Sequence, residues 1–312
     1  MLLKKSKTDK PILVIGDVIL DIYHFGDHLA DSEGVAVGRD RETRHSWGGA
    51  GLLVRNLLEL GQKVSFISLV GDDQWGEYEK QWTHRNLTKY FVRERVRKTV
   101  VKERFVVDGK KVFKWNSLED KRTSPATGRR MLSLVKKILP QCRVLVISDY
   151  RHGLLSRHLA TQLVTLAKKT DIPVVVDSQV SQRESNHQWY AGADVFCLNE
   201  EEARSIEPAF DAENIERSLQ QLSKILDSKY IVVKRGERGS VALISGAYIM
   251  SLPHKVKAVD SCGAGDAFLA ALASRGFPPN EDALRFANFW AALSTTVIGA
   301  EPPKYVQKYV RH

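Results

Sequence analysis

Short apolar segments alternate with longer amphipathic segments along most of this 312-residue chain. The apolar segments have the length of strands that are buried on both faces, and most of the segments between them repeat apolar residues with the spacing of a helix. This alternation predicts βαβ units and an α/β fold: a doubly wound, mostly parallel sheet with helices on both faces. The expected strands are 11–16, 63–70, 143–148, 173–176, 194–198 and 230–233, with a further pair at 240–244 and 247–252. The expected helices are 48–60, 74–85, 125–138, 156–169, 200–206, 212–226, 264–274 and 281–298.

Two segments, at about 24–47 and 90–116, do not fit this alternation. Both are strand-like in composition, and neither is followed by a crossover helix. Within the second segment, Asp108-Gly109 separates two alternating runs and predicts a tight hairpin. We expect the two segments to form a small β-sheet lid over the carboxyl ends of the parallel strands, where open α/β sheets bind ligands. The chain is thus predicted to be a single domain, 11–305, that follows a basic flexible tail at 1–10.

The composition, with 43% hydrophobic and 27% charged residues, is typical of a soluble globular protein. No apolar run approaches the roughly 18 residues of a membrane span. The lysine-rich start does not resemble a signal peptide, and three widely spaced cysteines suit a reducing compartment. We therefore expect a cytoplasmic protein with no membrane partner.

The net charge of +10 comes in part from basic residues between Arg93 and Arg122. These residues alternate with Val and Phe in a strand-like pattern, and no aromatic stacking platform accompanies them. We expect them on a solvated face of a small sheet, or near a phosphorylated substrate, rather than on nucleic acid.

The segment D-S-C-G-A-G-D at 260–266 opens the apolar helix predicted at 264–274. Its two glycines allow the backbone to approach a ligand without an intervening Cβ. Free N–H groups at a helix start, together with the positive end of the helix dipole, favour an anion. A carboxylate in the first turn, Asp266, can take a proton from a hydroxyl that attacks phosphorus. The segment therefore indicates phosphoryl transfer to an alcohol. The alternative is an ordinary helix N-terminus with a glycine-rich turn and a capping aspartate.

The longer string D-S-C-G-A-G-D-A-F closely resembles the D-T-x-G-A-G-D signature of the ribokinase-like (phosphofructokinase-B) carbohydrate kinases. Weaker matches to that family follow in the expected order over 11–305, almost the whole chain. They are G-D-V-I-L-D at 16–21 followed by Tyr23, W-G-G-A-G at 47–51, S-D-Y at 148–150 with Gly153, N-E-E-E at 199–202 and G-E-R-G at 236–239. The first and third of these are most similar to the D-glycero-beta-D-manno-heptose 7-phosphate kinase branch.

This resemblance implies that Asp266 is the base that activates the acceptor hydroxyl. It also implies that the amides of Gly263, Ala264 and Gly265 hold the transferring phosphoryl group. Lys102 and Arg104 would bind a substrate phosphate, although two such cations are also an ordinary way to blunt an exposed strand edge. Asp17 and Asp21 would accept hydrogen bonds from sugar hydroxyls, unless they are only acids at strand ends. The remaining substrate-binding residues expected are Gly48, Gly49 and Asp149.

For the nucleotide, the resemblance implies ATP with Mg²⁺. Asn199 and Glu202 would organise the Mg²⁺–phosphate shell through water, and the same pair also fits a helix capping box. Asp260 and the carbonyl of Cys262 would line the monovalent-cation site, for K⁺, that some family members have. The other nucleotide-binding residues expected are Lys234, Gly236, Gly239, Asn288 and Ala292.

The chain departs from the family pattern at three positions on the substrate side. Leu52 stands where the first glycine signature has an asparagine that hydrogen-bonds the sugar, a bond that leucine cannot make. His152 and Gln179 stand where the heptose branch has lysines. Signatures of other nucleotide and metal sites are absent from the sequence: there is no P-loop, no complete Rossmann fingerprint and no zinc-type spacing of Cys or His.

We therefore expect an ATP-dependent carbohydrate kinase. The resemblance favours phosphorylation of O1 of D-glycero-beta-D-manno-heptose 7-phosphate in the synthesis of lipopolysaccharide core precursors. The alternatives are a kinase for a different sugar or a nucleoside, and a non-catalytic scaffold that binds a sugar or nucleotide. Exposed edges of the lid strands further predict a homodimer in which two lids pair.

Overall fold

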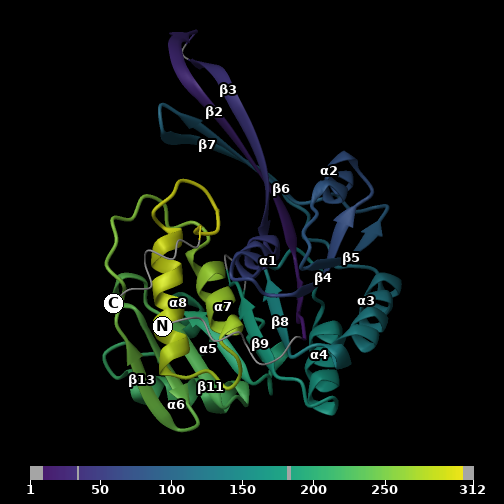
Figure 1. Cartoon of the computed structure of the whole chain (residues 1–312), viewed down its shortest axis with the longest axis vertical. Helices are drawn as coiled ribbons and strands as arrows, with labels where there is room; N and C mark the ends of the chain where they lie inside the picture. The colour runs from purple at the N-terminus through teal and green to yellow at the C-terminus, as the bar shows by residue number, and fades with distance from the viewer. Residues whose placement is uncertain (1–9, 34, 181–183, 305–312) are drawn as a thin grey trace.

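Nine strands form the larger of two sheets, in the order β13-β12-β11-β10-β9-β8-β1-β4-β5 (Figure 1). The computed structural model describes residues 10–33, 35–180 and 184–304. The strands from β11 to β5 run parallel, and β12 and β13 add an antiparallel edge, so the predicted mostly parallel sheet is confirmed. The bounds are β1 Ile12–Gly16, β4 Val64–Gly71, β5 Leu87–Glu94, β8 Val144–Asp149, β9 Val174–Ser178, β10 Val195–Asn199, β11 Tyr230–Lys234, β12 Ser240–Ile244 and β13 Ala247–Ser251.

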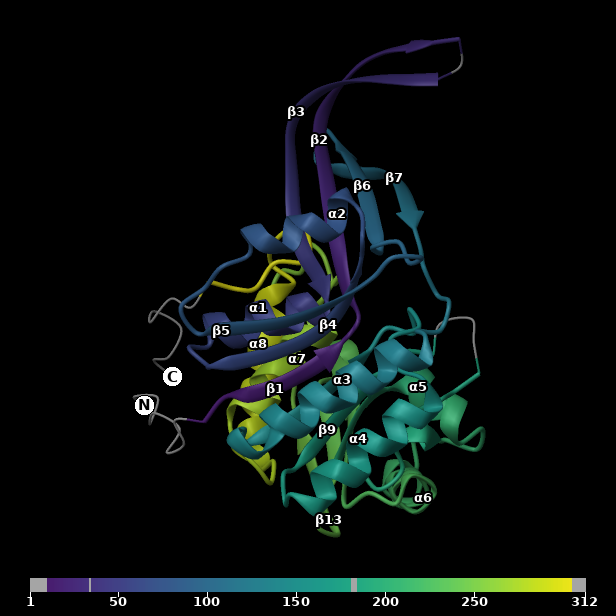
Figure 2. The same cartoon turned by 90° about the vertical axis from the view of Figure 1, so that its right-hand side faces the viewer.

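Helices cover both faces of this sheet (Figure 2). Alternate residues of β1 are buried on opposite faces of the sheet, so this strand is covered by helices on both sides. Ile12 and Val14 are buried in one core with α1 (Ala50–Glu59), α7 (Ala264–Ser274) and α8 (Glu281–Ser294). Leu13 and Ile15 are buried in the opposite core with α3 (Pro125–Ile138), α4 (Arg157–Lys169), α5 (Glu200–Ile206) and α6 (Ile215–Leu226). No helix in the described parts of the chain is long and apolar enough to cross a bilayer.

The smaller sheet has the order β3-β2-β6-β7 and projects away from the larger one (Figures 1 and 2). Its strands are β2 (Val18–Ser32), β3 (Val35–Gly49), β6 (Val101–Val107) and β7 (Lys110–Ser117). Asp108 and Gly109 turn β6 into β7 with φ of +48° and +76°, so the predicted hairpin is confirmed. Asp17 alone separates β1 from β2, and the lid therefore continues directly from a central strand of the large sheet.

The predicted lid segment 90–116 begins too early. Residues 87–94 are β5, which pairs in parallel with β4 at the edge of the large sheet. Lys89 and Arg93 of β5 make ion pairs with Glu79 and Glu77, so polar side chains on this edge strand hold the preceding short helices. Those charges made 90–94 resemble a solvated lid strand. The helix expected at 74–85 is shorter, with α2 at Gln74–Glu77 and a 3-10 turn, η1, at Tyr78–Gln81. Three further 3-10 turns are η2 (Leu139–Gln141), η3 (His187–Tyr190) and η4 (Gly236–Arg238).

Candidate active site

Helix α7 begins beside the carboxyl ends of the parallel strands, and its first turn is the glycine-rich segment. Gly263 is its N-cap residue, with φ +84°, a conformation that side chains rarely adopt. The Ala264 amide donates to the Ser261 carbonyl at 3.3 Å, whereas the amides of Gly263 and Gly265 have no hydrogen-bond partner among the described residues. A Cβ on Gly265 would meet only the ammonium nitrogen of Lys234, at 3.7 Å. The helix start therefore offers free donors and a nearby cation, which is the environment that an anion needs.

Asp266 lies one helical position after these glycines and is 8% exposed. Its Oδ2 accepts a hydrogen bond of 2.6 Å from the hydroxyl of Tyr150, which follows β8. Burial raises the pKa of Asp266 to about 7, and the Tyr150 hydrogen bond works against that increase. A carboxyl group with a pKa near neutrality can both accept and release a proton at physiological pH, as a general base must.

An ammonium and two carboxylates from neighbouring strand ends lie behind the helix start. The Nζ of Lys234, the last residue of β11, is 2.6 Å from Oδ2 of Asp177 on β9. Burial raises the pKa of Glu202 to about 7, Lys234 lowers it and Asp177 raises it. The Lys234 pKa is in turn raised by Asp177 and Glu202, against the effect of its burial. This cluster keeps one full positive charge facing Gly265.

Glu202 and Asn199 form the predicted capping box at the start of α5. The Asn199 side chain accepts from the Glu202 amide at 2.8 Å, and Glu202 Oε2 accepts from the Asn199 amide at 2.7 Å. One oxygen of the Glu202 carboxylate thereby accepts a hydrogen bond from the cap of its own helix. The other Glu202 oxygen and the Asp177 carboxylate form the set of oxygen ligands that could face a hydrated Mg²⁺ ion.

The other predicted nucleotide-side residues lie on and around the antiparallel edge of the sheet. Gly236 and Gly239 bound η4, and both have positive φ. The neighbouring Arg235 and Arg238 pair with Glu200, which ties this turn to α5. Asn288 is 8% exposed and donates to Ser240 and Ser251, so its amide holds α8 against β12 and β13. Ala292 lies one turn further along α8 and is half-buried.

The predicted substrate-side cations and Asp21 meet where β2 pairs with β6. Arg104 donates to Oδ1 of Asp21 at 2.5 Å, and its guanidinium lies 5.3 Å from the centre of the Tyr23 ring. The Lys102 ammonium lies 5.9 Å from the centre of the Tyr150 ring. Burial lowers the pKa of Lys102, and the Asp21 and Asp266 carboxylates act in the opposite direction. The lid therefore brings two cations to the same side as Asp266.

The two predicted glycines of the first signature lie close to these residues. A Cβ on Gly48 would overlap the Asp21 carboxylate, so only glycine fits there without moving that side chain. Gly49 is the N-cap residue of α1 and has φ +59°. Both glycines allow the chain to pass directly from lid strand β3 into α1.

Asp17 and Asp149 contact the protein itself rather than open space. The Asp17 carboxylate accepts from the amides of Tyr150, His152 and Leu154 at 3.1–3.3 Å. Burial raises the Asp17 pKa to about 7, and the nearby Asp149 carboxylate raises it further. Asp149 accepts from a buried set of donors formed by Ser178, Asn186, Tyr190 and the Arg151 amide. Both carboxylates thus hold the backbone of loop 150–154. Direct contact of Asp17 or Asp149 with a sugar hydroxyl stays a prediction.

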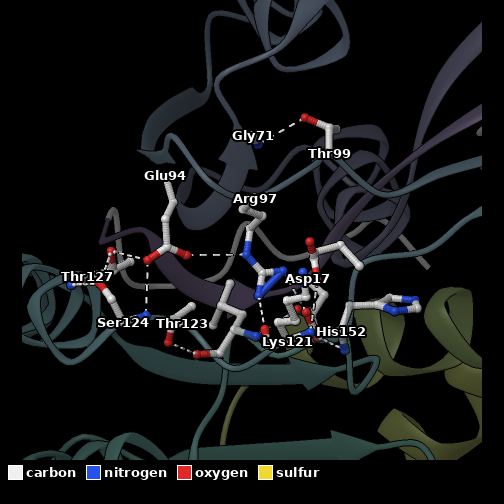
Figure 3. A network of polar contacts seen from close by, with 12 residues as sticks. Asp17, Gly71, Glu94, Arg97, Thr99, Lys121, Thr123, Ser124, Thr127 and His152 are labelled. Carbon is white, nitrogen blue, oxygen red and sulfur yellow. Dashed lines mark hydrogen bonds and ion pairs between the residues drawn. The ribbon is translucent and has the colours of Figure 1, made fainter.

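Arg97 supports the same loop from the segment that joins β5 to the lid (Figure 3). Its guanidinium is buried, donates to the carbonyls of His152 and Lys121, and lies near the Glu94 carboxylate. Sequence reasoning assigned no role to Arg97, Tyr150 or Asp177. Tyr150 and Asp177 lie at or just beyond the carboxyl end of an apolar run, and that position was the available signal. Arg97 follows the polar strand β5 and had no such signal.

The three departures from the family pattern fall around this site. Leu52 is buried and packs beside Gly263, where a Cβ would touch its side chain. His152 contributes its backbone amide and carbonyl to the Asp17 and Arg97 contacts. The Gln179 amide donates to the Asp149 carbonyl at 3.0 Å. Two of the three residues therefore take part in the loop structure through their backbones.

The buried carboxyls predict an unusual pH dependence of stability. Asp17, Glu202 and Asp266 have pKa values of about 7 in the folded chain, against about 4 in an unfolded one. Between these values the native state binds more protons, so raising the pH from 5 to 7 is expected to lower the free energy of unfolding, by about 1.4 kcal/mol per pH unit for each such proton. Urea unfolding at several pH values measures this slope. Asp266→Asn should reduce this slope by the contribution of about one proton. A free energy of unfolding that rises between pH 5 and pH 7 would contradict the raised pKa values of these carboxyls.

The Tyr150 hydroxyl is expected to hold down the pKa of Asp266. Tyr150→Phe removes the 2.6 Å bond, and since hydrogen bonds to charged groups contribute about 1.5–3 kcal/mol, the Asp266 pKa should rise by about one unit or more. Carboxyl ¹³C NMR titration measures this directly and needs no turnover. Tyr248→Phe, which removes a hydroxyl bonded to Gln220 on the far edge of the sheet, serves as the control and should leave Asp266 unchanged. An unchanged Asp266 titration in Tyr150→Phe would show that the hydrogen bond is not energetically significant.

The chain is similar to known carbohydrate kinases over nearly its whole length. The family model described as pfkB family carbohydrate kinase matches residues 9–305. A "Bifunctional protein HldE" from a Nitratiruptor species is 30% identical over 298 residues, which is 93% of this chain and 62% of that protein. A second protein of that name, from Geobacter sulfurreducens, is 29% identical over 92% of this chain and 60% of its own length. The chain thus spans about three fifths of these relatives.

Two solved structures share the fold at lower sequence identity. Arabidopsis thaliana ribokinase, complexed with ribose and ATP, has a TM-score of 0.69 at 20% identity and covers 95% of this chain and 97% of its own. Phosphofructokinase-2 from Escherichia coli, in complex with potassium, has a TM-score of 0.77 at 18% identity and covers 94% and 95%. Both confirm the ribokinase-like α/β fold with its smaller second sheet.

Proposed function

The chain belongs to the pfkB family of carbohydrate kinases, and from this premise we propose that it transfers the terminal phosphoryl group of ATP to O1 of D-glycero-beta-D-manno-heptose 7-phosphate. The product would serve the synthesis of lipopolysaccharide core precursors. The observation that carries the reaction type is the position of Asp266, a buried carboxyl with a pKa of about 7 in the same helical turn as two free backbone donors.

The described residues fit the groups that such a reaction needs. The amides of Gly263 and Gly265, with the Lys234 ammonium, would hold the terminal phosphate as its charge develops, and such preorganised donors are typically worth about 3–4 kcal/mol each in the transition state. Asp266 would accept the proton of the attacking hydroxyl. Glu202 and Asp177 would hold Mg²⁺ through water, and that ion would neutralise part of the phosphate charge.

The choice of acceptor rests on the lid cations and on the named relatives. Lys102 and Arg104 lie on lid strand β6 and face the Asp266 side of the molecule. Two such cations suit a substrate that carries its own phosphate at the end remote from the reacting hydroxyl. The proteins named HldE, at up to 30% identity, favour a heptose phosphate.

A panel of acceptors tests the proposal. ATP consumption by the purified chain should be measured with heptose 7-phosphate, fructose 6-phosphate, ribose and a nucleoside, with product regiochemistry read by ³¹P and ¹³C NMR. Turnover of the heptose phosphate alone supports the assignment, and turnover of another acceptor reassigns the substrate within the family.

The non-catalytic scaffold is a second candidate, and two observations favour it. The Tyr150 hydroxyl occupies Oδ2 of the proposed base, and Leu52 replaces a sugar-binding asparagine beside the helix start. Calorimetric binding of ATP with no turnover of any acceptor would support this candidate.

The proposed assembly is a cytoplasmic homodimer that forms through the lids. All residues of edge strand β7 are exposed, and Val112, Phe113 and Trp115 are each more than half exposed. An unpaired edge with apolar side chains is the type of surface that a second copy can cover.

A further inference from the structure

We propose that the ammonium group of Lys111 is a built-in substitute for the monovalent cation beside the glycine-rich turn, so that the chain does not require K⁺. This inference rests on the proposed kinase function for its catalytic consequence, but its structural part can be tested without turnover. It is an alternative to the expectation that Asp260 and the Cys262 carbonyl line a K⁺ site.

The Lys111 side chain crosses from the lid to the body of the protein. Lys111 is on β7, and its Nζ lies 2.5 Å from Oδ2 of Asp260, which is 149 residues away in the loop before α7. Lys111 lies on an exposed strand, but the side chains of the pair are only 26% exposed for Lys111 and 12% for Asp260. A partly buried pair of this kind is less screened by salt than a pair on an open surface.

Both oxygens of the Asp260 carboxylate already accept hydrogen bonds from the protein. Besides the Lys111 ammonium, its Oδ2 accepts from the Gly299 amide at 2.9 Å, and its Oδ1 accepts from the Cys262 amide at 3.1 Å. Burial alone would raise the Asp260 pKa, but the hydrogen bonds from Lys111, Gly299 and Cys262 outweigh it and lower the pKa. The single negative charge of Asp260 is thus matched by the Lys111 ammonium, and a K⁺ ion bound to this carboxylate would have to compete with that ammonium.

A β-bulge directs Lys111 toward Asp260. Phe105 pairs with Phe113, but the next residue of β6, Val106, pairs with Lys111 rather than with Val112. The extra residue, Val112, is 59% exposed. Side chains alternate along a strand, so without this shift Lys111 would lie on the same face of the sheet as Phe113. The bulge instead places Lys111 on the face that carries Lys102 and Arg104. Bulges commonly re-aim a side chain in this way.

The position of the ammonium suits a supporting role for the phosphate site. Asp260 holds the Cys262 amide, and Cys262 directly precedes Gly263, the N-cap residue of α7. It also holds Gly299, in the segment that follows α8. A lysine ammonium is a compact point charge with three donors, so Lys111 can supply both the charge and the cross-link that an ion would otherwise supply. Lys111 is in this sense a positioning residue.

Thermal unfolding tests the structural part with KCl exchanged for tetramethylammonium chloride at constant ionic strength. The wild-type melting temperature should be the same in both salts. Lys111→Met should be less stable in tetramethylammonium and should be restored by K⁺ in a saturable manner, since ligand binding to the native state stabilises it. Lys110→Met, an equal charge change at the exposed neighbouring position on β7, should show no salt-specific response. A saturable K⁺ response of the wild type overturns the proposal, as does a Lys111→Met variant that responds no differently from Lys110→Met.

Turnover provides the second readout. With the acceptor that the panel identifies, K⁺ should change the wild-type rate less than about twofold and should raise the Lys111→Met rate by about tenfold, the factor that corresponds to about 1.4 kcal/mol. A strong K⁺ requirement in the wild type would again overturn the inference. If no acceptor is turned over but the melting results hold, the kinase proposal fails while the assignment of Lys111 stands.

Discussion

Asp266→Asn is expected to reduce kcat by about 10²–10⁴-fold, the usual contribution of a general base, while the affinity for ATP stays close to that of the wild type. Asparagine keeps the shape of the side chain and can still accept the Tyr150 hydrogen bond. It cannot take a proton from the acceptor hydroxyl. The loss should therefore fall on kcat rather than on KM, as it does when an interaction is made only in the transition state.

A matched variant separates this effect from general damage to the fold. Asp194→Asn changes an aspartate whose carboxylate accepts from the Val174 amide at the opposite end of the strands, and it should retain nearly full kcat. Nucleotide binding by calorimetry and melting temperature should be measured for both variants. Full activity of Asp266→Asn would remove the proposed mechanism, whatever the acceptor.

Lys234→Met is expected to lower the free energy of unfolding by about 3–5 kcal/mol near neutral pH, because it removes one partner of a buried ion pair and leaves the other uncompensated. Lys234 is 2.6 Å from Asp177, and it also lowers the pKa of Glu202. Without the ammonium the pKa of Glu202 should rise further above its unfolded value. The penalty should therefore be largest above pH 7 and should shrink as the pH falls toward 5, where the carboxyl is protonated in the folded chain.

Two further variants show whether the charge itself is responsible. Lys234→Met combined with Asp177→Asn should recover part of the lost stability, since the orphaned carboxylate is gone. Lys168→Met breaks a solvent-exposed pair with Asp227, whose atoms are 3.9 Å apart, and should have little effect. Chemical denaturation at pH 5 and pH 8 measures all of them. A penalty for Lys234→Met that is equal at both pH values would show that lost packing, and not charge, sets its size.

The fold was predictable because its signals are local. All residues of the run at 11–16 are apolar. A strand with this sequence is buried only if helices cover both faces of its sheet. The turn at Asp108-Gly109 and the capping box at Asn199 and Glu202 were likewise evident from neighbouring residues. The exception is β5, whose Lys89 and Arg93 are polar because they meet Glu79 and Glu77, partners that only the folded edge of the sheet brings together.

The site was predictable only in part because its contacts are distant in the sequence. The position of Asp266 followed from the glycine-rich string that precedes it. The Tyr150 hydroxyl on Asp266 joins residues 116 positions apart, and Lys111 reaches Asp260 across 149 positions. The sequence around Tyr150 and around Lys111 contains no pattern that indicates these contacts. Periodicity likewise assigns Lys111 to the wrong face of its strand, because the bulge at Phe105/Val106 shifts the register.

The continuity of β1 and β2 has a mechanical consequence. Only Asp17 separates β1, an interior strand of the large sheet, from β2, which carries the lid, so a swing of the lid relative to the body is expected to bend the backbone near that residue. The Asp17 side chain is attached to three amides of the loop 150–154, and the first of them belongs to Tyr150. A hinge movement near Asp17 is therefore expected to reach the phenol that covers the proposed base. We expect acceptor entry and the release of the Asp266 carboxylate from Tyr150 to be coupled in this way.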